Sequence, residues 1–165
     1  RFLKATGLGG GHPWCAAFVS YCLSQAGAAE PPTRSAAARH FIRKESLLAR
    51  DVLRTGTPLP PGTILVWKRG STPQGHVGFV VRWEGASGET VEGNTSSGRA
   101  GSQCDGDGVW RRHRRIDAGS YFRIVAFTPV RYRGRDSRES SPLAPGTGER
   151  MPDASSSAWS LPSWW

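Results

Sequence analysis

The sequence is poor in cysteine and in long apolar runs, and both shortages limit the kind of protein that it encodes. Only three of the 165 residues are cysteine, which is an odd and sparse count for this length. It argues against a disulfide scaffold, and no C-x-x-C pair suggests a zinc site. No run of eighteen apolar residues occurs, so we expect no membrane-spanning segment. The first residues, 1–6, contain no apolar h-region, so no signal peptide is visible.

Acidic residues are also scarce, and the basic excess narrows the choice of partners. The chain has 13 Asp and Glu residues and 22 Lys and Arg residues, which gives a net charge of +9. This balance favours polyanions such as nucleic acid, acidic lipid or the phosphate-rich polymers of bacterial envelopes. One hypothesis is therefore a non-catalytic basic module that uses Arg111–Arg115 and Arg131–Arg138 to bind nucleic acid or an envelope polymer. No nucleic-acid-binding motif is present, so we do not expect a nucleic-acid partner.

The domain organisation follows from a change in composition near residue 133. Hydrophobic residues make up 37% of the chain, which is low for a fully globular protein. From Arg133 onward Ser, Pro, Gly and Arg dominate and no apolar period survives. We therefore predict one domain over 1–132 and a disordered tail over 133–165 that ends in tryptophans. Those tryptophans either bind a partner, fold back on the domain or do nothing.

The apolar periodicity predicts helices first and strands afterwards. Residues 1–13 are rich in glycine and predict a loop, and a helix begins near Trp14 and stops at Gly27. After a linker at 31–33, Ser35 is expected to cap a second helix that runs to about residue 50. The predicted strands are 63–67, 76–83, 89–92, 109–115 and 124–128, with a hairpin turn at 84–88. This order predicts an α+β fold in which N-terminal helices pack on an antiparallel β-sheet.

Cys15 is the candidate nucleophile because it lies in the first turn of the predicted helix. The unpaired N–H groups and the dipole there favour a thiolate, and they can stabilise an oxyanion beside the sulfur. Cys22 lies two turns later on the same apolar face without this electrostatic help, and we interpret it as a packing residue. Packing is also the plainer alternative for Cys15.

A nucleophilic cysteine needs a base, and His76 is the best placed of the four histidines. It opens a strand after Gly75, so its ring can project from a sheet edge into a cleft. Pro13 directs the chain away from a local pair between His12 and Cys15, although His12 can still line the cleft. The other two histidines are poorer candidates. His40 lies on the surface of a predicted helix, and His113 lies among four arginines whose positive field disfavours its protonation.

Glu92 and Asn94 are the candidate partners of His76, because they end the strand expected to pair with it. A Glu92 carboxylate can accept a hydrogen bond from the second ring nitrogen and favour the imidazolium. Asn94 can do this more weakly or bind substrate. A solvated hairpin end is the commoner fate of a glutamate after a strand, and it stays open for Glu92.

Three ordered motifs carry a resemblance to a known family. Pro13–Ser20, Gly75–Val80 and Glu92–Thr95 resemble the corresponding segments of the CHAP family, the cysteine, histidine-dependent amidohydrolases/peptidases. The similarity extends from about residue 12 to about residue 128. One departure is Gly62-Thr63, where relatives often carry Gly-Asp. The resemblance implies a papain-like fold and hydrolysis of peptidoglycan amides, with Cys15 as nucleophile, His76 as general base and Glu92 as orienting acid.

The same resemblance implies that Asn94 belongs to the site, and by position we expect Trp14, Trp67 and His12 to line the substrate groove. Some relatives bind calcium, but the loop with Asp105 and Asp107 lacks an EF-hand ligand pattern, so we predict no metal and no cofactor.

The expected protein is a monomeric N-acetylmuramoyl-L-alanine amidase or peptide endopeptidase that acts on peptidoglycan. It would be secreted or delivered to the periplasm or cell wall, as a lysin or as an antibacterial toxin with an immunity protein that plugs its cleft. The same triad would also serve a cysteine peptidase or transferase with another acyl substrate.

Overall fold

The computed structural model describes residues 1–30, 34–97, 106–117 and 119–132. The chain divides into two units, Arg1–Arg135 and Asp136–Trp165, and the described residues all belong to the first. The tail predicted over 133–165 and the linker predicted at 31–33 lie outside the described residues.

The helix that carries Cys15 forms as the periodicity predicts. Helix α2 spans Cys15–Gln25, and Gly27 follows it with a φ of 69°, a left-handed conformation that ends a helix at little cost for glycine. The loop predicted over residues 1–13 is wrong at its start, where Phe2–Ala5 form the short helix α1. This turn is held by its aromatic side chain, because the Phe2 ring lies 5.3 Å from the ring of Trp14 and 5.3 Å from that of Phe18.

The second helix predicted from Ser35 to residue 50 is not present as one element. The segment contains a short 3₁₀ helix, η1 (Ala38–Phe41), and a two-residue strand, β2 (Leu47–Leu48), before helix α3 (Ala49–Thr55). Ser35 does not cap a helix. Its N–H donates to the Ser20 hydroxyl at 3.0 Å, and that hydroxyl donates to the Ser35 carbonyl at 2.7 Å. These two bonds fasten the segment to α2, so a tertiary contact overrides the local helical pattern.

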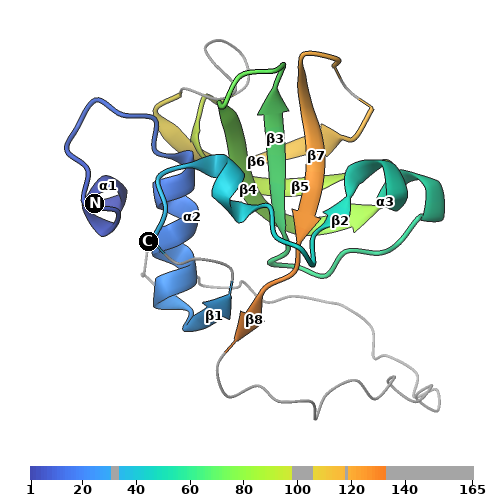
Figure 1. Cartoon of the computed structure of the whole chain (residues 1–165), viewed down its shortest axis with the longest axis horizontal. Coiled ribbons are helices and arrows are strands. Elements are labelled where there is room, and N and C mark those ends of the chain that lie inside the picture. The colour runs from blue at the N-terminus through green and yellow to red at the C-terminus, as the bar shows by residue number, and fades with distance from the viewer. Residues whose placement is uncertain (31–33, 98–105, 118, 133–165) are drawn as a thin grey trace, which may run out of the picture. The chain divides into compact units, whose positions relative to one another are not determined.

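Six strands form one antiparallel sheet in the order β2-β7-β3-β4-β5-β6 (Figure 1). Strands β3 to β6 lie side by side in chain order, and β7 then returns to pair with β3. A separate pair joins β1 (Ala28–Glu30) to β8 (Arg131–Tyr132). The long strands are β3 (Ile64–Arg69), β4 (Gly75–Glu84), β5 (Ser87–Thr95), β6 (Gly108–Arg115) and β7 (Phe122–Thr128).

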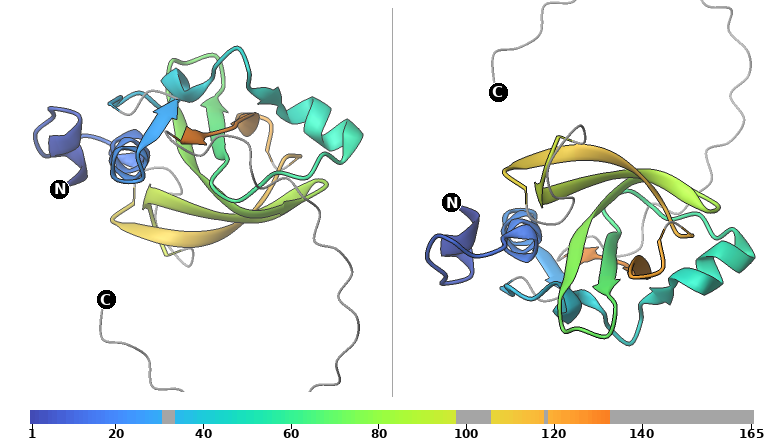
Figure 2. Two further views of the ribbon diagram at one scale, coloured as in Figure 1. Left: turned by 90° about the horizontal axis from the view of Figure 1, so that it is seen from below. Right: turned by 90° about the horizontal axis from the view of Figure 1, so that it is seen from above.

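The two faces of the sheet are buried in two different ways. Helix α2, seen almost end-on in Figure 2, packs against one side of the curved sheet, where Phe18 and Val19 meet Val77. On the other face the sheet surrounds a second core that includes Trp67, Trp83 and Phe127. The fold is α+β with a helix packed on an antiparallel sheet, as predicted. Among the described helices, none is both long enough and apolar enough to cross a membrane.

Candidate active site

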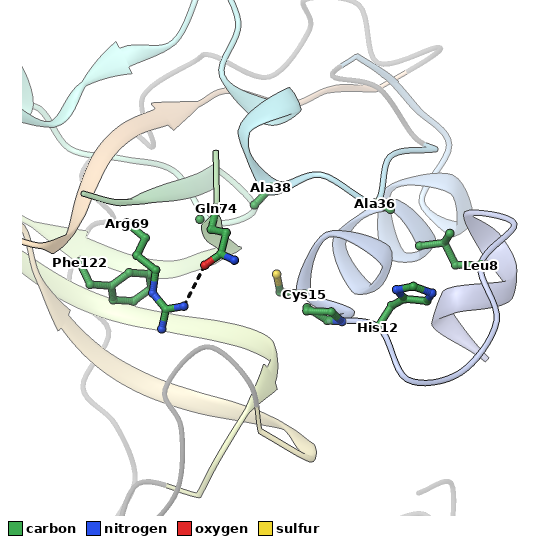
Figure 3. Close-up of a pocket in the computed structure, with 10 residues that line it drawn as sticks. Leu8, His12, Cys15, Ala36, Ala38, Arg69, Gln74 and Phe122 are labelled. Carbon is green, nitrogen blue, oxygen red and sulfur yellow. Dashed lines mark hydrogen bonds between the residues drawn. The ribbon is translucent and has the colours of Figure 1, made fainter. Parts of the chain in front are cut away.

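Cys15 is the first residue of α2, and Trp14 is the residue before the helix. The N–H groups of a first helical turn have no acceptor within the helix, and no described side chain caps them here. The Cys15 side chain is only 5% exposed, yet it lines a cavity of about 380 Å³. Figure 3 shows its sulfur directed from the start of the helix into the space beside Gln74. The thiol is therefore largely buried but can be reached from the cavity.

His76 lies on β4 beside this thiol and is fully buried. Its backbone is opposite Trp67 of β3, and the two rings lie 5.1 Å apart. The imidazole Nε2 is 3.1 Å from Oε2 of Glu92 on β5. Nδ1 is buried without an oxygen or nitrogen partner among the described residues, and the Cys15 side chain interacts with the same ring. With Nε2 engaged by Glu92, Nδ1 is the nitrogen that is left for the sulfur.

The surroundings of His76 favour its charged form. Burial lowers the pKa of an imidazole, but the hydrogen bonds and charges of Cys15 and Glu92 outweigh this effect and raise the pKa of His76 to about 9. Burial also raises the pKa of the Glu92 carboxyl, and hydrogen bonds from Arg114 and His76 outweigh it and lower that pKa to about 2. At neutral pH the site therefore holds an imidazolium against a carboxylate.

Arg114 and Thr90 hold the Glu92 carboxylate in place, and the sequence did not reveal either of them. The Arg114 guanidinium donates through Nε to Oε1 at 2.8 Å and through Nη2 to Oε2 at 2.6 Å. The Thr90 hydroxyl donates to Oε1 at 2.5 Å. Thr90 lies two residues before Glu92 and therefore shares its face of β5, which is a signal that sequence could have supplied. Arg114 is reached only through the pairing of β5 with β6.

Gly78 on β4 makes room for this carboxylate. It lies directly opposite Glu92 in the pairing of β4 with β5. A Cβ at position 78 would come within 2.7 Å of Cγ of Glu92 and 2.8 Å of the carbonyl oxygen of Val91, closer than such atoms approach in proteins. The Glu92 side chain can therefore lie over β4 only because residue 78 is glycine.

The other predicted site residues occupy different places. His12 lines the cavity with Cys15. Trp14 is half-buried and stacks on Phe2, and it is not among the described lining residues. Trp67 is 4% exposed and packs against the imidazole, so it supports His76 from behind and does not form the groove wall that we expected. Asn94 is 2% exposed near the end of β5, with a left-handed φ of 59°, and its role in the site stays a prediction.

The remaining cavity wall was not foreseen. Some lining residues come from the β3–β4 hairpin and β7, and others come from the segment before α2 and from the start of η1 with the residues just before it. The described lining residues beyond His12 and Cys15 are Leu8, Pro13, Ala36, Ala38, Arg69, Gln74, Gly75 and Phe122. Figure 3 shows Arg69 and Gln74 on the opposite side of Cys15 from His12 and Leu8. The described part of the chain contains no group of three or more His, Cys, Asp or Glu side chains placed to hold a metal ion.

The basic run of β6 does not form one continuous cationic stripe. Arg111, His113 and Arg115 are exposed, whereas Arg112 and Arg114 are half-buried and alternate with them along the strand. Arg114 is engaged by Glu92, and Arg115 forms an ion pair with Asp117 at 2.7 Å. At least two of these charges therefore already have anionic partners within the chain.

A thiol at a helix start, next to an imidazole that is oriented by a carboxylate, can carry out nucleophilic acyl transfer. The comparison with protein families agrees with this chemistry, because the family model described as CHAP domain matches residues 7–94, more than half of the chain. The chain belongs to the CHAP family. The matched CHAP segment contains Cys15, His76, Glu92 and Asn94, and CHAP domains are generally hydrolases.

Membership of the CHAP family indicates a peptidoglycan hydrolase-like or amidase-like function for this chain. It also agrees with the α+β fold and the mostly antiparallel sheet. No curated protein and no solved structure matches the chain.

Proposed function

We propose that this protein hydrolyses an amide bond of peptidoglycan, with Cys15 as the nucleophile and His76 as its acid and base. The observation that carries the proposal is the continuous chain of contacts that begins at the cavity. The Cys15 thiol interacts with the His76 ring, which is bonded to Glu92, which is in turn held by Arg114. A buried cysteine that served only for packing would not need a charged relay behind it.

The geometry supports a two-step acyl transfer. The Cys15 thiolate attacks the carbonyl carbon of the amide, and the N–H groups at the start of α2 stabilise the negative oxygen that forms. The C–N bond then breaks as the His76 imidazolium gives its proton to the departing amine. The neutral imidazole takes a proton from water, whose oxygen attacks the thioester. The carbon–sulfur bond breaks, which releases a carboxylic acid and regenerates the thiolate–imidazolium pair.

Glu92 and Arg114 act through His76 and do not touch the substrate in this scheme. The carboxylate holds the ring by Nε2, so that Nδ1 stays directed to the sulfur, and it stabilises the imidazolium. Arg114 keeps the carboxylate ionised although it is buried. Both are therefore positioning residues.

The test compares two cysteine variants on purified cell walls. Cys15→Ala is expected to lower lysis of peptidoglycan sacculi by at least about a thousandfold, because removal of a nucleophile leaves only binding and oxyanion stabilisation. Cys22→Ala is the matched control, because Cys22 is a half-buried cysteine of the same helix that burial leaves with a raised pKa. This control should retain lysis. Circular dichroism should show that both variants are folded, and full lysis by folded Cys15→Ala would overturn the proposal.

Mass spectrometry of the digested wall distinguishes the two finer forms of the proposal. An N-acetylmuramoyl-L-alanine amidase releases intact stem peptides from the glycan, whereas an endopeptidase leaves shortened peptides attached to it. A non-catalytic envelope-binding module would release neither product, and its binding to walls would fall with salt and be indifferent to Cys15.

We also propose that the protein acts on the wall from outside the bacterial cytoplasm, as a lysin or as a toxin delivered between bacteria. The wall lies outside the cytoplasmic membrane, so activity should depend on where the protein is placed. Expression in a Gram-negative host with an added export signal should cause lysis, whereas cytoplasmic expression should not. Exported Cys15→Ala is the control, and equal toxicity of this variant would contradict the proposal.

A further inference from the structure

A second cavity lies near β8 and shares no described lining residue with the cavity beside Cys15. Its volume is about 610 Å³, and the described residues that line it are Ile42, Arg43, Lys44, Glu45 and Arg131. Three of them carry a positive side chain and one carries a carboxylate. We call this space the basic cavity, and its charge favours an anionic ligand.

The basic cavity lies toward the opposite end of α2 from the nucleophile. Arg131 begins β8, which pairs with β1 just after the last turn of α2, whereas Cys15 is the first residue of that helix. Figure 1 shows β1 and β8 beside the end of α2. The helix spans about 16 Å, at about 1.5 Å for each of its eleven residues. A ligand can therefore bind in the basic cavity without occupying the Cys15 cavity.

Hydrogen bonds fix the turn that carries Arg43, Lys44 and Glu45. The Arg43 N–H donates to the Ser46 hydroxyl at 2.7 Å, and the Ser46 N–H donates to the Arg43 carbonyl at 3.1 Å. The Ser46 hydroxyl also lies 2.7 Å from the hydroxyl of Thr128, the fully buried last residue of β7. Strand β8 begins three residues after Thr128. The turn and β8 are therefore anchored to the same strand end, which holds their cations around one space.

The charges of this cavity have no ionic partner close by. None of the three cations forms an ion pair within the described part of the chain, and all three side chains are exposed. Like charges around one cavity repel one another, and an anion with several negative groups lowers this repulsion when it binds. The described wall contains one apolar side chain, Ile42, and no aromatic ring on which a nucleic acid base could stack.

We propose that Arg43, Lys44 and Arg131 bind phosphodiester groups of an anionic polymer of the bacterial wall, and thereby hold the protein on the wall. A phosphodiester chain carries one negative charge per unit, so a single polymer can contact cations of both segments. A guanidinium binds two phosphate oxygens at once, and the Lys44 ammonium binds as a point charge. This inference goes beyond the proposed function, because the binding step needs neither Cys15 nor the bond that it attacks.

Sedimentation with purified cell walls measures this binding, in the full chain with Cys15→Ala so that the walls are not digested. One wall preparation keeps its phosphate polymers, and a second has lost them through hydrofluoric acid, which breaks phosphodiester bonds. We expect binding to the stripped walls to be at least about tenfold weaker at low salt. Each neutralised phosphate adds about 0.7–0.9 to the slope of log affinity against log salt concentration, so three contacts should contribute about 2–3.

A triple variant connects the binding to this cavity. In the Cys15→Ala chain, Arg43→Gln, Lys44→Gln and Arg131→Gln together should lower the salt slope by about 2–3. A rise in salt from about 50 to about 200 mM should then weaken wall binding by the chain with the intact cavity about 15- to 60-fold more than binding by the variant. The variant should also bind native and stripped walls equally.

A second triple variant is the matched control. It combines Arg50→Gln, Arg111→Gln and Arg123→Gln, which replace three exposed arginines that line neither cavity. The control loses the same net charge as the cavity variant, so it separates a local site from the general positive charge of the protein. It should keep the original salt slope. Circular dichroism should show that both variants are folded.

The cavity substitutions should also separate wall binding from catalysis. With Cys15 intact, the cavity variant should cleave muropeptides, the soluble disaccharide-peptide fragments of peptidoglycan, as fast as wild type, because these fragments carry no wall polymer. It should lyse native walls more slowly. An absence of cleavage by wild type itself would contradict the proposed function and would leave the binding test intact.

Three results would overturn the inference: equal binding to native and stripped walls, an unchanged salt slope in the cavity variant, or an equal loss of slope in the control variant. Vesicles of phosphatidylglycerol and duplex DNA, compared with native walls at equal phosphate concentration, test the other sources of phosphate. If either were bound more tightly than native walls through the basic cavity, the assignment to a wall polymer would be wrong.

Discussion

Replacement of Arg114 by methionine tests the buried charge relay most directly. Methionine keeps an unbranched apolar stem against Trp67, whose ring centroid lies 5.7 Å from the guanidinium carbon of Arg114. It removes both charge-assisted bonds to the Glu92 carboxylate. Glu92 is fully buried, so water does not reach its carboxylate to replace the hydrogen bonds that Arg114 made.

The expected cost follows from the Glu92 pKa. The fall from 4.5 to about 2 corresponds to about 3 kcal/mol of net stabilisation of the carboxylate, at about 1.4 kcal/mol for each pH unit. Arg114 contributes two of the bonds that outweigh burial, and His76 contributes one. Removal of one partner of a buried pair costs about 3–5 kcal/mol, and less when that partner is partly exposed. The Arg114 side chain is 18% exposed, so we expect Arg114→Met to lower the free energy of unfolding by about 2–4 kcal/mol at pH 7.

The loss should depend on pH with a definite sign. A carboxyl whose pKa is lowered by folding contributes its stability above the unfolded pKa of 4.5 and loses it as pH falls through about 2. The difference in the free energy of unfolding between wild type and Arg114→Met should therefore have its full size at pH 7 and should shrink between pH 4.5 and pH 2. Denaturant unfolding followed by tryptophan fluorescence at several pH values measures both effects.

Arg115→Met is the matched control for this experiment. Arg115 is the next residue on β6 and also pairs with a carboxylate, but both side chains of that pair are about half exposed. Exposed ion pairs contribute little, so its unfolding midpoint should stay close to that of wild type. Equal destabilisation by the two variants, or an Arg114→Met protein as stable as wild type at pH 7, would refute the role assigned to Arg114.

Two further predictions concern the proposed catalytic pair, Cys15 and His76, and the space around it. The pKa of His76 is about 9, so kcat/KM should fall above about pH 9 as the imidazolium that protonates the leaving amine is lost; a profile that fell already near pH 6.5 would contradict this. Gly78→Ala should displace the Glu92 side chain and reduce wall lysis at least about tenfold, since overpacking of this kind costs about 1–3 kcal/mol. Gly9→Ala, at a position with open space around it, should lyse walls like wild type.

Local patterns were enough to place the chemistry-bearing residues on their elements. The i, i+3, i+4 spacing after Trp14 predicted helix α2, and with it the position of Cys15 at a helix start. The strand that begins before His76 and the strand that carries Glu92 were both predicted. The bond between His76 and Glu92 agrees with the prediction that the second strand pairs back on the first.

The same local reasoning failed where the structure depends on contacts between residues that are far apart in the sequence. The helical pattern after Ser35 gave way because Ser20, fifteen residues earlier, binds the Ser35 backbone. The Trp67 ring was expected in the groove, but the pairing of β3 with β4 places it against the imidazole and buries it. Neither outcome is contained in the residues that immediately surround these positions.

By itself the sequence determined the helix start under Cys15, the two strands that bear His76 and Glu92, and the family, because each depends on residues within a few positions of one another. Only the tertiary structure decided that Arg114 holds Glu92 and that Arg69 lines the cavity. Arg114 and Glu92 are 22 residues apart, and the register of β5 on β6 brings them together. That register depends on burial along the whole sheet, since a slip of one residue would turn every side chain of the strand to the other face.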